Sequence, residues 1–241
     1  MKNQYHLLLE TSTRICSVGL SKNGKIWILK EANQRDEHAS KLTLFIEEIL
    51  NLAQLKMADL SAVAVSKGPG SYTGLRIGLS TAKGICYATQ LPLLGLSTLK
   101  ALVRETLVYW SAPSLNQKTV YLAMLDARRM DVYAALYDER MHCLKEDHFA
   151  TVSLDYLEDL QSTYNADRIC LIGNAVEKLT PLLEGKEKSF IISPIQNNSA
   201  KFLAGLAEDA FNQRQFEDVA YMKPFYLKKP HITQPKSRLF K

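Results

Sequence analysis

The two halves of the chain show the same order of predicted secondary structure, and this repetition limits the fold more than any other feature of the sequence. Each half is predicted to contain three strands, a helix, a strand and a helix, because apolar residues recur at strand or helix spacing. In the first half these elements lie at 7–9, 16–20, 26–29, 37–53, 62–65 and from the turn at 67–71 to about 89. In the second half they lie at 120–125, 132–137, 144–149, 154–162, 169–172 and 176–183.

Two further helices complete this prediction, one that connects the halves at 97–109 and one near the end at 199–211. A duplicated unit of alternating strands and helices predicts an α/β fold of two lobes related by a rough two-fold axis. Each lobe should contain a mixed sheet covered by helices. We place the lobes at 1–110 and 111–241, and the final helix and tail could pack back on the first lobe.

The composition is that of an ordinary globular protein rather than a disordered or fibrous one. The chain has 241 residues, of which 46% are hydrophobic and 23% are charged. No run approaches the ~18 consecutive apolar residues of a membrane helix, and the first apolar segment ends at Glu10, too early for a secretory signal. We therefore expect a cytoplasmic protein that makes no membrane contact.

The chain shows no recognisable catalytic or metal motif. Cys16, Cys86, Cys143 and Cys170 form no CxxC pair, and their spacing supports neither a metal site nor a disulfide framework, so we predict that all four are small buried apolar residues. The five histidines form neither an HxxH nor an HxxxH pair. No serine lies in a GxSxG turn.

The positive charge is concentrated in two stretches. The net charge is +5, and no Asp or Glu lies between Leu60 and Arg104 or after Asp218. The basic residues concerned are Lys67, Arg76, Lys83, Lys100 and Arg104 in the first stretch, and Lys223, Lys228, Lys229, Lys236, Arg238 and Lys241 in the tail. Such clusters attract an anionic partner such as RNA or a nucleotide phosphate. A solvated basic surface with a frayed tail is an alternative of equal weight.

Five of the eleven glycines lie within or just after the segment 68–78. A glycine-rich turn between a strand and a helix exposes backbone N–H groups at the positive end of the helix, which suits an anion, and Ser71 is the predicted N-cap. The segment lacks the Gly-Lys-Ser/Thr of a Walker A loop, and its GxGxxxG spacing is one residue longer than the dinucleotide motif. It is therefore a candidate anion site without a recognised nucleotide motif.

The glycines inside the second helix predict close packing against another helix. Gly74, Gly78 and Gly84 each cost about 1 kcal/mol relative to alanine, which some contact must offset. A helical wheel gives a small face of Gly74, Gly78, Thr81 and Ile85 beside a larger apolar face of Leu75, Leu79, Ala82 and Cys86. In the first helix Leu44 lies roughly 200° from Leu42, away from the core stripe. We predict that the small face is an association surface, although spacing does not distinguish the protein's own helix from a partner's.

Carboxylates follow the first strand of each half, at Glu10 and Asp126. In a two-lobed nucleotide-binding protein such a pair can hold a hydrated metal beside the phosphates. Together with Thr11, Ser12 and Ser71 they would then form a vestigial nucleotide or anion site. The favoured alternative is that both carboxylates cap N–H groups of their own turns, because the phosphate-loop glycines are missing.

Several segments of the sequence resemble the TsaB (YeaZ) family. They are LLETST at 8–13, CSV at 16–18, HASKL at 38–42, KGPGSYTGLRIG at 67–78, LPL at 91–93, GLSTL at 95–99, LDARRMDVY at 125–133 and PFYL at 224–227. The matches span most of the chain, and the glycine-rich one is highly specific. The region 138–212 matches mainly by its order of elements.

This resemblance implies an actin-like, Hsp70-like fold of the ribonuclease H-like type. It also implies a non-catalytic role in making threonylcarbamoyladenosine beside the anticodon of tRNAs that read codons starting with A. The chain would pair with TsaD, the ATPase TsaE would join the pair, and a similar surface could form a homodimer in isolation. The chain itself would need no cofactor, whereas the partner subunits would use ATP and a divalent metal. The implied interface on the first two helices comprises His38, Leu42, Leu44, Phe45, Gly74, Gly78, Thr81, Ala82 and Ile85.

Two departures from related proteins bear on the competing functions. Glu10 stands where many family members have Asp, and Gly173 stands alone where a nucleotide-binding relative would have a glycine cluster. The alternative function is a stand-alone ATPase or small-molecule kinase that uses Glu10 and Asp126. TsaD itself is longer and carries an HxxxH metal motif that this chain lacks, and a peptidase would need a nucleophile–base pair that is not visible.

Overall fold

The computed structural model describes residues 3–33, 38–110 and 117–228, without the side chains of residues 38 and 39. The first lobe contains β1 (Tyr5–Glu10), β2 (Ile15–Lys22), β3 (Lys25–Asn33), α1 (His38–Ala53), η1 (Met57–Asp59), β4 (Ala62–Gly68), α2 (Tyr72–Thr89), β5 (Leu93–Ser97) and α3 (Thr98–Tyr109). The second part contains β6 (Thr119–Asp126), β7 (Asp131–Tyr137), β8 (Cys143–Thr151), α4 (Leu154–Thr163), β9 (Arg168–Ile172), η2 (Val176–Leu182), β10 (Phe190–Ile192), η3 (Ala200–Leu203) and α5 (Ala204–Asn212).

Each lobe has one five-stranded sheet, and the two sheets share one topology. The order is β3-β2-β1-β4-β5 in the first lobe and, read in the same sense, β8-β7-β6-β9-β10 in the second. In both, the first strand of the lobe pairs antiparallel with the second strand and parallel with the fourth. The predicted duplication and the predicted mixed sheets are therefore confirmed.

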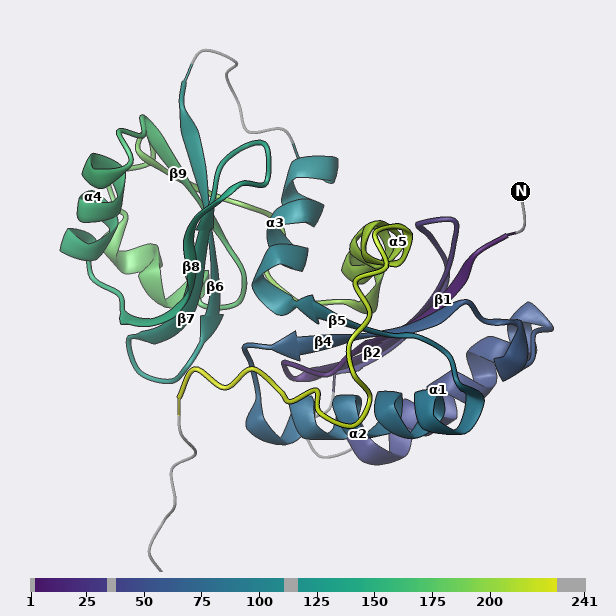
Figure 1. Cartoon of the computed structure of the whole chain (residues 1–241). Helices are drawn as coiled ribbons and strands as arrows, with labels where there is room; N and C mark the ends of the chain where they lie inside the picture. Colours follow the sequence, from purple (N-terminus) through teal and green to yellow (C-terminus); the bar gives the residue numbers. More distant parts are fainter. Residues whose placement is uncertain (1–2, 34–37, 111–116, 229–241) are drawn as a thin grey trace, which may run out of the picture.

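Helices cover both faces of the two sheets, which share a core between them (Figure 1). Leu7 and Leu9 of β1 face the outer cluster under α1 and α2, whereas Leu8 belongs to the central cluster with α3 and α5. In β6, Leu122 faces the outer cluster near α4 and Tyr121 faces the centre. Because both faces are buried, these strands appear in the sequence as continuous apolar runs rather than as alternating ones.

Three elements differ from the prediction. The sequence predicts no strand at β5 or β10, which have five and three residues and are too short to show a clear period. The predicted helix at 176–183 is the 3-10 helix η2, and it contains Pro181, which has no N–H to donate. Cys143 is exposed at the start of the edge strand β8, so its predicted burial is wrong, whereas the other three cysteines are buried.

After α5 the chain runs along the first lobe again. The helix α5 contacts β1 and β5, and Glu217 then forms a bridge with Leu93 of β5. The following residues pass α2 and end beside the second lobe, as the yellow segment of Figure 1 shows. We call residues 217–228 the strap. The predicted lobe boundary at 110 adjoins residues 111–116, which lie outside the description, so it stays a prediction.

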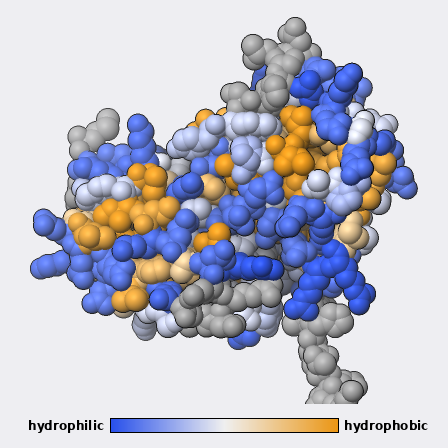
Figure 2. Space-filling model, turned by 180° about the vertical axis from the view of Figure 1, so that it is seen from behind, coloured by the Kyte–Doolittle hydropathy of each residue, from blue (hydrophilic) through white to orange (hydrophobic). Residues whose placement is uncertain are grey.

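Among the described residues, no helix is long and apolar enough to cross a membrane. Apolar side chains nevertheless reach the surface, and on the rear face of the first lobe they gather in a band at the left of Figure 2. The exposed large apolar residues of this lobe include Ile26, Trp27, Leu44 and Leu52. A cytoplasmic location stays a prediction.

Candidate functional site

The glycine-rich loop after β4 packs against the turn after β1. The Ser71 N–H donates to the Ser12 carbonyl oxygen at 2.6 Å, and the Ser71 hydroxyl accepts from the Gly74 N–H at 3.3 Å, so the predicted N-cap is confirmed. Gly68 has φ +119°, and a Cβ there would lie 2.6 Å from the Phe225 carbonyl oxygen of the strap. The donors that an anion would need at Ser71 and Gly74 are therefore already bonded within the protein.

Gly74 and Gly78 are buried inside the first lobe against Thr11. A Cβ on Gly74 would overlap the Thr11 carbonyl oxygen, and a Cβ on Gly78 would overlap the Thr11 hydroxyl. That hydroxyl also donates to the Gly74 carbonyl oxygen at 2.8 Å. The prediction that these glycines form an exposed association surface is wrong. The helical wheel gave the angles between their positions correctly, but it could not show that the turn after β1 faces them.

The other residues of the predicted interface divide between core and surface. Leu42 and Ala82 are fully buried, which contradicts their placement on a partner surface. Leu44 is 44% exposed, as its wheel angle predicts. His38 begins α1, and its side chain lies outside the description. The half-buried members are Phe45, Thr81 and Ile85.

The exposed side of α2 carries a different set of small residues. Ser80, Gly84 and Ala88 are exposed at intervals of four, and a Cβ on Gly84 would have nothing within 4 Å. The neighbouring helix α1, which contacts α2, exposes Leu44 and, to 61%, Leu52. The spacing of 80, 84 and 88 was visible in the sequence, but nothing there showed which side of α2 faces solvent.

Glu10 is a buried carboxyl group at the end of β1. Its Oε1 accepts from the Ser12 N–H at 2.7 Å and from the Ser66 hydroxyl at 3.0 Å. Burial raises the pKa of Glu10, and the hydrogen bonds from Ser12 and Ser66 offset this only in part. Within the described part of the chain, Oε2 is buried without a hydrogen-bond partner. A carboxyl group held this way favours its neutral form, whereas a hydrated divalent metal prefers an ionised carboxylate open to water.

Asp126, at the equivalent position of the second lobe, is exposed and paired. Its Oδ1 accepts from the Lys178 ammonium and from the Arg128 N–H, both at 2.9 Å. Partial burial opposes ionisation, yet these two hydrogen bonds and the Lys178 charge lower the pKa of Asp126. Like Glu10, Asp126 accepts from the N–H two residues further on, which confirms the turn-capping alternative. The described residues contain no group of three or more His, Cys, Asp or Glu placed to bind a metal.

The lone glycine of the second lobe also serves packing. Gly173 has φ +99°, and a Cβ there would overlap the Met124 carbonyl oxygen of β6. The next residue, Asn174, accepts from the Asp126 N–H at 2.8 Å through its side-chain oxygen. The turn after β9 thus binds the turn after β6, as the loop after β4 binds the turn after β1.

Part of the first basic stretch holds the strap. Lys67 pairs with Glu217 at 3.1 Å, and the Lys83 ammonium donates to the carbonyl oxygens of Ala220 and Met222 at 3.0 and 3.3 Å. These contacts join residues 137 to 150 positions apart, so local patterns could not predict them. The described part of the predicted basic tail contains Lys223 and Lys228, and residues 229–241 lie outside the description.

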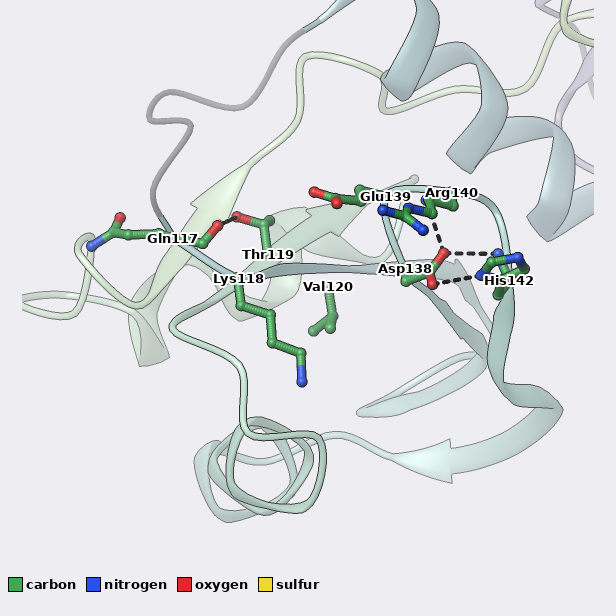
Figure 3. A pocket seen from close by; sticks show the side chains of 8 residues that line it. All are labelled: Gln117, Lys118, Thr119, Val120, Asp138, Glu139, Arg140 and His142. Carbon is green, nitrogen blue, oxygen red and sulfur yellow. Dashed lines mark hydrogen bonds and ion pairs between the residues drawn. The ribbon is translucent and has the colours of Figure 1, made fainter.

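A hollow of about 480 Å³ lies at the other end of β6 from Asp126 (Figure 3). Asp138 points into the β7–β8 turn, where it accepts from the Arg140 and His142 N–H groups and pairs with the His142 ring at 2.9 Å. These contacts are all within the turn. The hollow lies at the start of β6, whereas the loops that carry the sequence motifs follow the ends of β1, β4 and β6.

Known proteins resemble this chain along nearly its whole length. The family model described as TsaD, tRNA N6-adenosine threonylcarbamoyltransferase, matches residues 30–235. The tRNA threonylcarbamoyladenosine biosynthesis protein TsaB of Escherichia coli (strain K12) is 27% identical, over 92% of this chain and 94% of that protein.

Two solved structures from Pseudomonas aeruginosa share the fold. One, a protein with similarity to peptidase YEAZ, has a TM-score of 0.75 at 23% identity, and the other, YeaZ, has 0.70 at 22%. Each comparison covers 93% of this chain and 100% of the other. At these identities the likeness establishes the fold, and it agrees with the expected two-lobed, actin-like architecture.

Proposed function

Because this chain belongs to the family of TsaD, tRNA N6-adenosine threonylcarbamoyltransferase, and within it to the TsaB (YeaZ) branch, we propose that it takes part in making threonylcarbamoyladenosine in tRNA as a non-catalytic subunit. The modified adenosine would lie beside the anticodon of tRNAs that read codons starting with A. The packing of the glycine-rich loop supports the non-catalytic role most directly. Its Ser71 and Gly74 donors bond within the protein, and the adjacent Glu10 is buried.

In this proposal the larger TsaD-type subunit binds the outer face of α1 and α2. Leu44 and Leu52 offer apolar area there, and Ser80, Gly84 and Ala88 would let a partner helix approach closely. The same face would form a homodimer when the chain is alone. TsaE would join the assembled pair, and ATP and a divalent metal would be used by the partner subunits rather than by this chain.

Reconstitution tests the proposed role. The chain is combined with TsaD-type and TsaE-type subunits, ATP, a divalent metal, threonylcarbamoyl adenylate and unmodified tRNA, and the modified nucleoside is measured by mass spectrometry. We expect product only when the chain is present, and negligible ATP hydrolysis by the chain alone. Metal-dependent ATP turnover by the isolated chain that is lost in Glu10→Ala would instead support the stand-alone ATPase or kinase.

The proposed partner face has its own test in Gly84→Leu. Because a Cβ at Gly84 meets open space, the variant should fold normally. A leucine there should obstruct a partner helix, and overpacking of about 1 to 3 kcal/mol corresponds to a roughly five- to hundredfold loss of affinity, measured by calorimetry. Ser162→Leu, on an exposed position of α4, is the matched control. Wild-type affinity in Gly84→Leu would place the partner elsewhere.

A further inference from the structure

The strap crosses from one lobe to the other within a few residues. The Phe225 N–H donates to the Lys67 carbonyl oxygen at the end of β4, at 2.7 Å. Three residues later, Lys228 pairs with Asp131 at the start of β7, at 3.4 Å. The strap therefore joins the end of β4 in the first lobe to the start of β7 in the second, and Figure 1 shows it passing α2 on its way to the second lobe.

Aromatic rings gather on both sides of this crossing. The Tyr226 ring of the strap packs on the Tyr72 ring of α2, with 4.7 Å between centroids. On the second lobe, the Phe149 ring lies 6.1 Å from that of Tyr133. Four of these rings are partly exposed, with between 38% and 43% of their area open to solvent: Tyr72, Phe149, Phe225 and Tyr226. Burying such large rings would normally stabilise the protein.

Cations lie against these rings. The Arg76 guanidinium is 5.4 Å from the Tyr72 ring centroid and donates to the Tyr72 hydroxyl at 3.2 Å. Lys228 lies 4.5 Å from the Phe149 ring centroid. We call Tyr72, Arg76, Phe149, Phe225, Tyr226 and Lys228 the crossing surface.

Two acids beside the strap are already paired with cations. Asp131 accepts from Lys228 and from the Thr151 hydroxyl at 2.8 Å, and Glu217 pairs with Lys67. Among the described residues Arg76 has no acidic partner.

We propose that the crossing surface binds single-stranded RNA. Exposed rings flanked by cations suit this ligand, since bases stack on aromatic faces while the cations meet the phosphates. RNA loops present unstacked bases, and the loop around the anticodon is one of these. The inference rests on the proposed function, which makes tRNA the RNA concerned. An acidic protein partner would satisfy the cations but would not need four exposed rings beside them, so RNA is the favoured occupant.

The test uses a fluorescently labelled, unmodified anticodon stem-loop RNA and the full chain with a saturating TsaD-type subunit. Fluorescence anisotropy should show that Tyr226→Ala weakens RNA binding by roughly five- to hundredfold, since it removes one stacking platform, whereas Tyr226→Phe stays within about twofold. Arg76→Gln should weaken binding and reduce the slope of log affinity against log salt by about 0.7 to 0.9.

The controls use a second ring and cation of the same chemistry on the far strands of the first sheet. Trp27 of β3 is 46% exposed, and Lys22 lies 5.6 Å from its ring centroid. Trp27→Ala and Lys22→Ala should leave RNA affinity unchanged. An equal loss in these controls would show non-specific binding and overturn the proposal.

Two other results would also overturn it. One is wild-type RNA affinity in both Tyr226→Ala and Arg76→Gln, or no RNA binding by the wild-type assembly. The other is weakened binding of the TsaD-type subunit with unchanged RNA affinity, which would assign the surface to a protein. If Tyr226→Ala lowers the unfolding temperature, its loss of RNA binding could come from misfolding. The RNA affinity of Arg76→Gln, on the exposed side of α2, then decides whether the crossing surface binds RNA. If the wild-type assembly does not modify tRNA, the proposed function is refuted. If all variants modify tRNA as well as the wild type does, only the proposed RNA surface is refuted.

Discussion

The two lobes share one strand order, yet side chains at equivalent positions differ in burial and in charge. Glu10 and Asp126 both end the first strand of a lobe and both cap the following turn, but Glu10 is 1% exposed while Asp126 lies at the surface beside Lys178. Four residues earlier the first lobe has His6 and the second has Leu122, and both are fully buried. The two lobes thus share a backbone arrangement, but at these two positions the first lobe buries an ionisable group and the second does not.

The helices that follow the fourth strands differ in the same sense. In the first lobe α2 has 18 residues and packs its glycines on the turn after β1. In the second lobe the equivalent element is η2, a 3-10 helix of seven residues. The longer helix gives the first lobe an outer face that a partner can use, and it makes the turn with Glu10 part of the packing. These differences between the lobes lead to three predictions, ordered from the largest expected effect to the smallest.

Gly78→Leu should cause the largest loss of stability. The new side chain must displace Thr11, which also bonds Gly74, so we expect the free energy of unfolding to fall by about 3 kcal/mol or more. Urea unfolding measures this. Gly84→Leu is the matched control on the exposed side of the same helix and should be at least as stable as the wild type, because its side chain meets open space and leucine favours a helix. Equal stability of the two variants would mean that Gly78 is no more tightly packed than the exposed Gly84.

His6→Leu gives the first lobe the residue that the second lobe has. Burial lowers the pKa of His6 to about 4 from a usual 6.5, so the unfolded chain takes up the proton first, and stability is lost as the pH falls from about 6.5 to about 4. At ~1.4 kcal/mol per pH unit this loss amounts to at most roughly 3 kcal/mol. Glu208, 3.6 Å from the ring, would reduce it by stabilising the charged form.

Urea unfolding at pH 7 and at pH 4.5 measures the effect of His6→Leu. On going from pH 7 to pH 4.5, the leucine variant should lose less free energy of unfolding than the wild type does. At pH 7 it should be at least as stable as the wild type, because neither ring nitrogen of His6 has a hydrogen-bond partner within the described structure. His142→Gln, on an exposed turn, should keep the acid loss. An unchanged pH dependence in His6→Leu would mean that the ring takes up its proton equally in the folded and the unfolded chain, so that burial does not lower its pKa.

Sequence periodicity was enough to predict most of this architecture. It placed α1, α2 and the central strands close to their observed bounds, and it identified Ser71 as a cap and Leu44 as an exposed apolar residue. These features depend on contacts within a few residues, or on the division of one element into apolar and polar sides. Local patterns carry that information.

The candidate site was predicted less well because it depends on what lies opposite each residue. The small face of Gly74 and Gly78 was identified correctly as a packing face, but its partner is Thr11, far away in the sequence. The strap contacts of Lys67 and Lys83 likewise join distant segments. Nor could the sequence show that Glu10 is buried and Asp126 exposed, since both have the same local turn.

The smallest expected effect is also the most direct test of the contrast between the lobes. The pKa of Glu10 is raised, so its contribution to stability is complete below about pH 4.5 and is lost as the pH rises toward the folded pKa. The pKa of Asp126 is lowered, so its contribution is present above about pH 3.8 and is lost as the pH falls. Glu10→Gln and Asp126→Asn should therefore change the pH dependence of stability with opposite signs.

The free energy of unfolding is measured in urea from pH 3 to pH 7 for the wild type and both variants. The difference between each variant and the wild type isolates one carboxyl group, because the titration of all other groups cancels. Asp126→Asn should cost no more than about 0.5 kcal/mol at pH 6, because Asp126 is exposed and its pair with Lys178 is screened by solvent, and this cost should shrink as the pH falls toward 3. Glu10→Gln keeps an oxygen for Ser12 and Ser66, so it should gain on the wild type by an amount on the order of 1 kcal/mol as the pH rises. The same sign in both variants would mean that Glu10 is an ionised carboxylate like Asp126. The first lobe would then hold a charged group poised for a cation, and the case for a working nucleotide site would return.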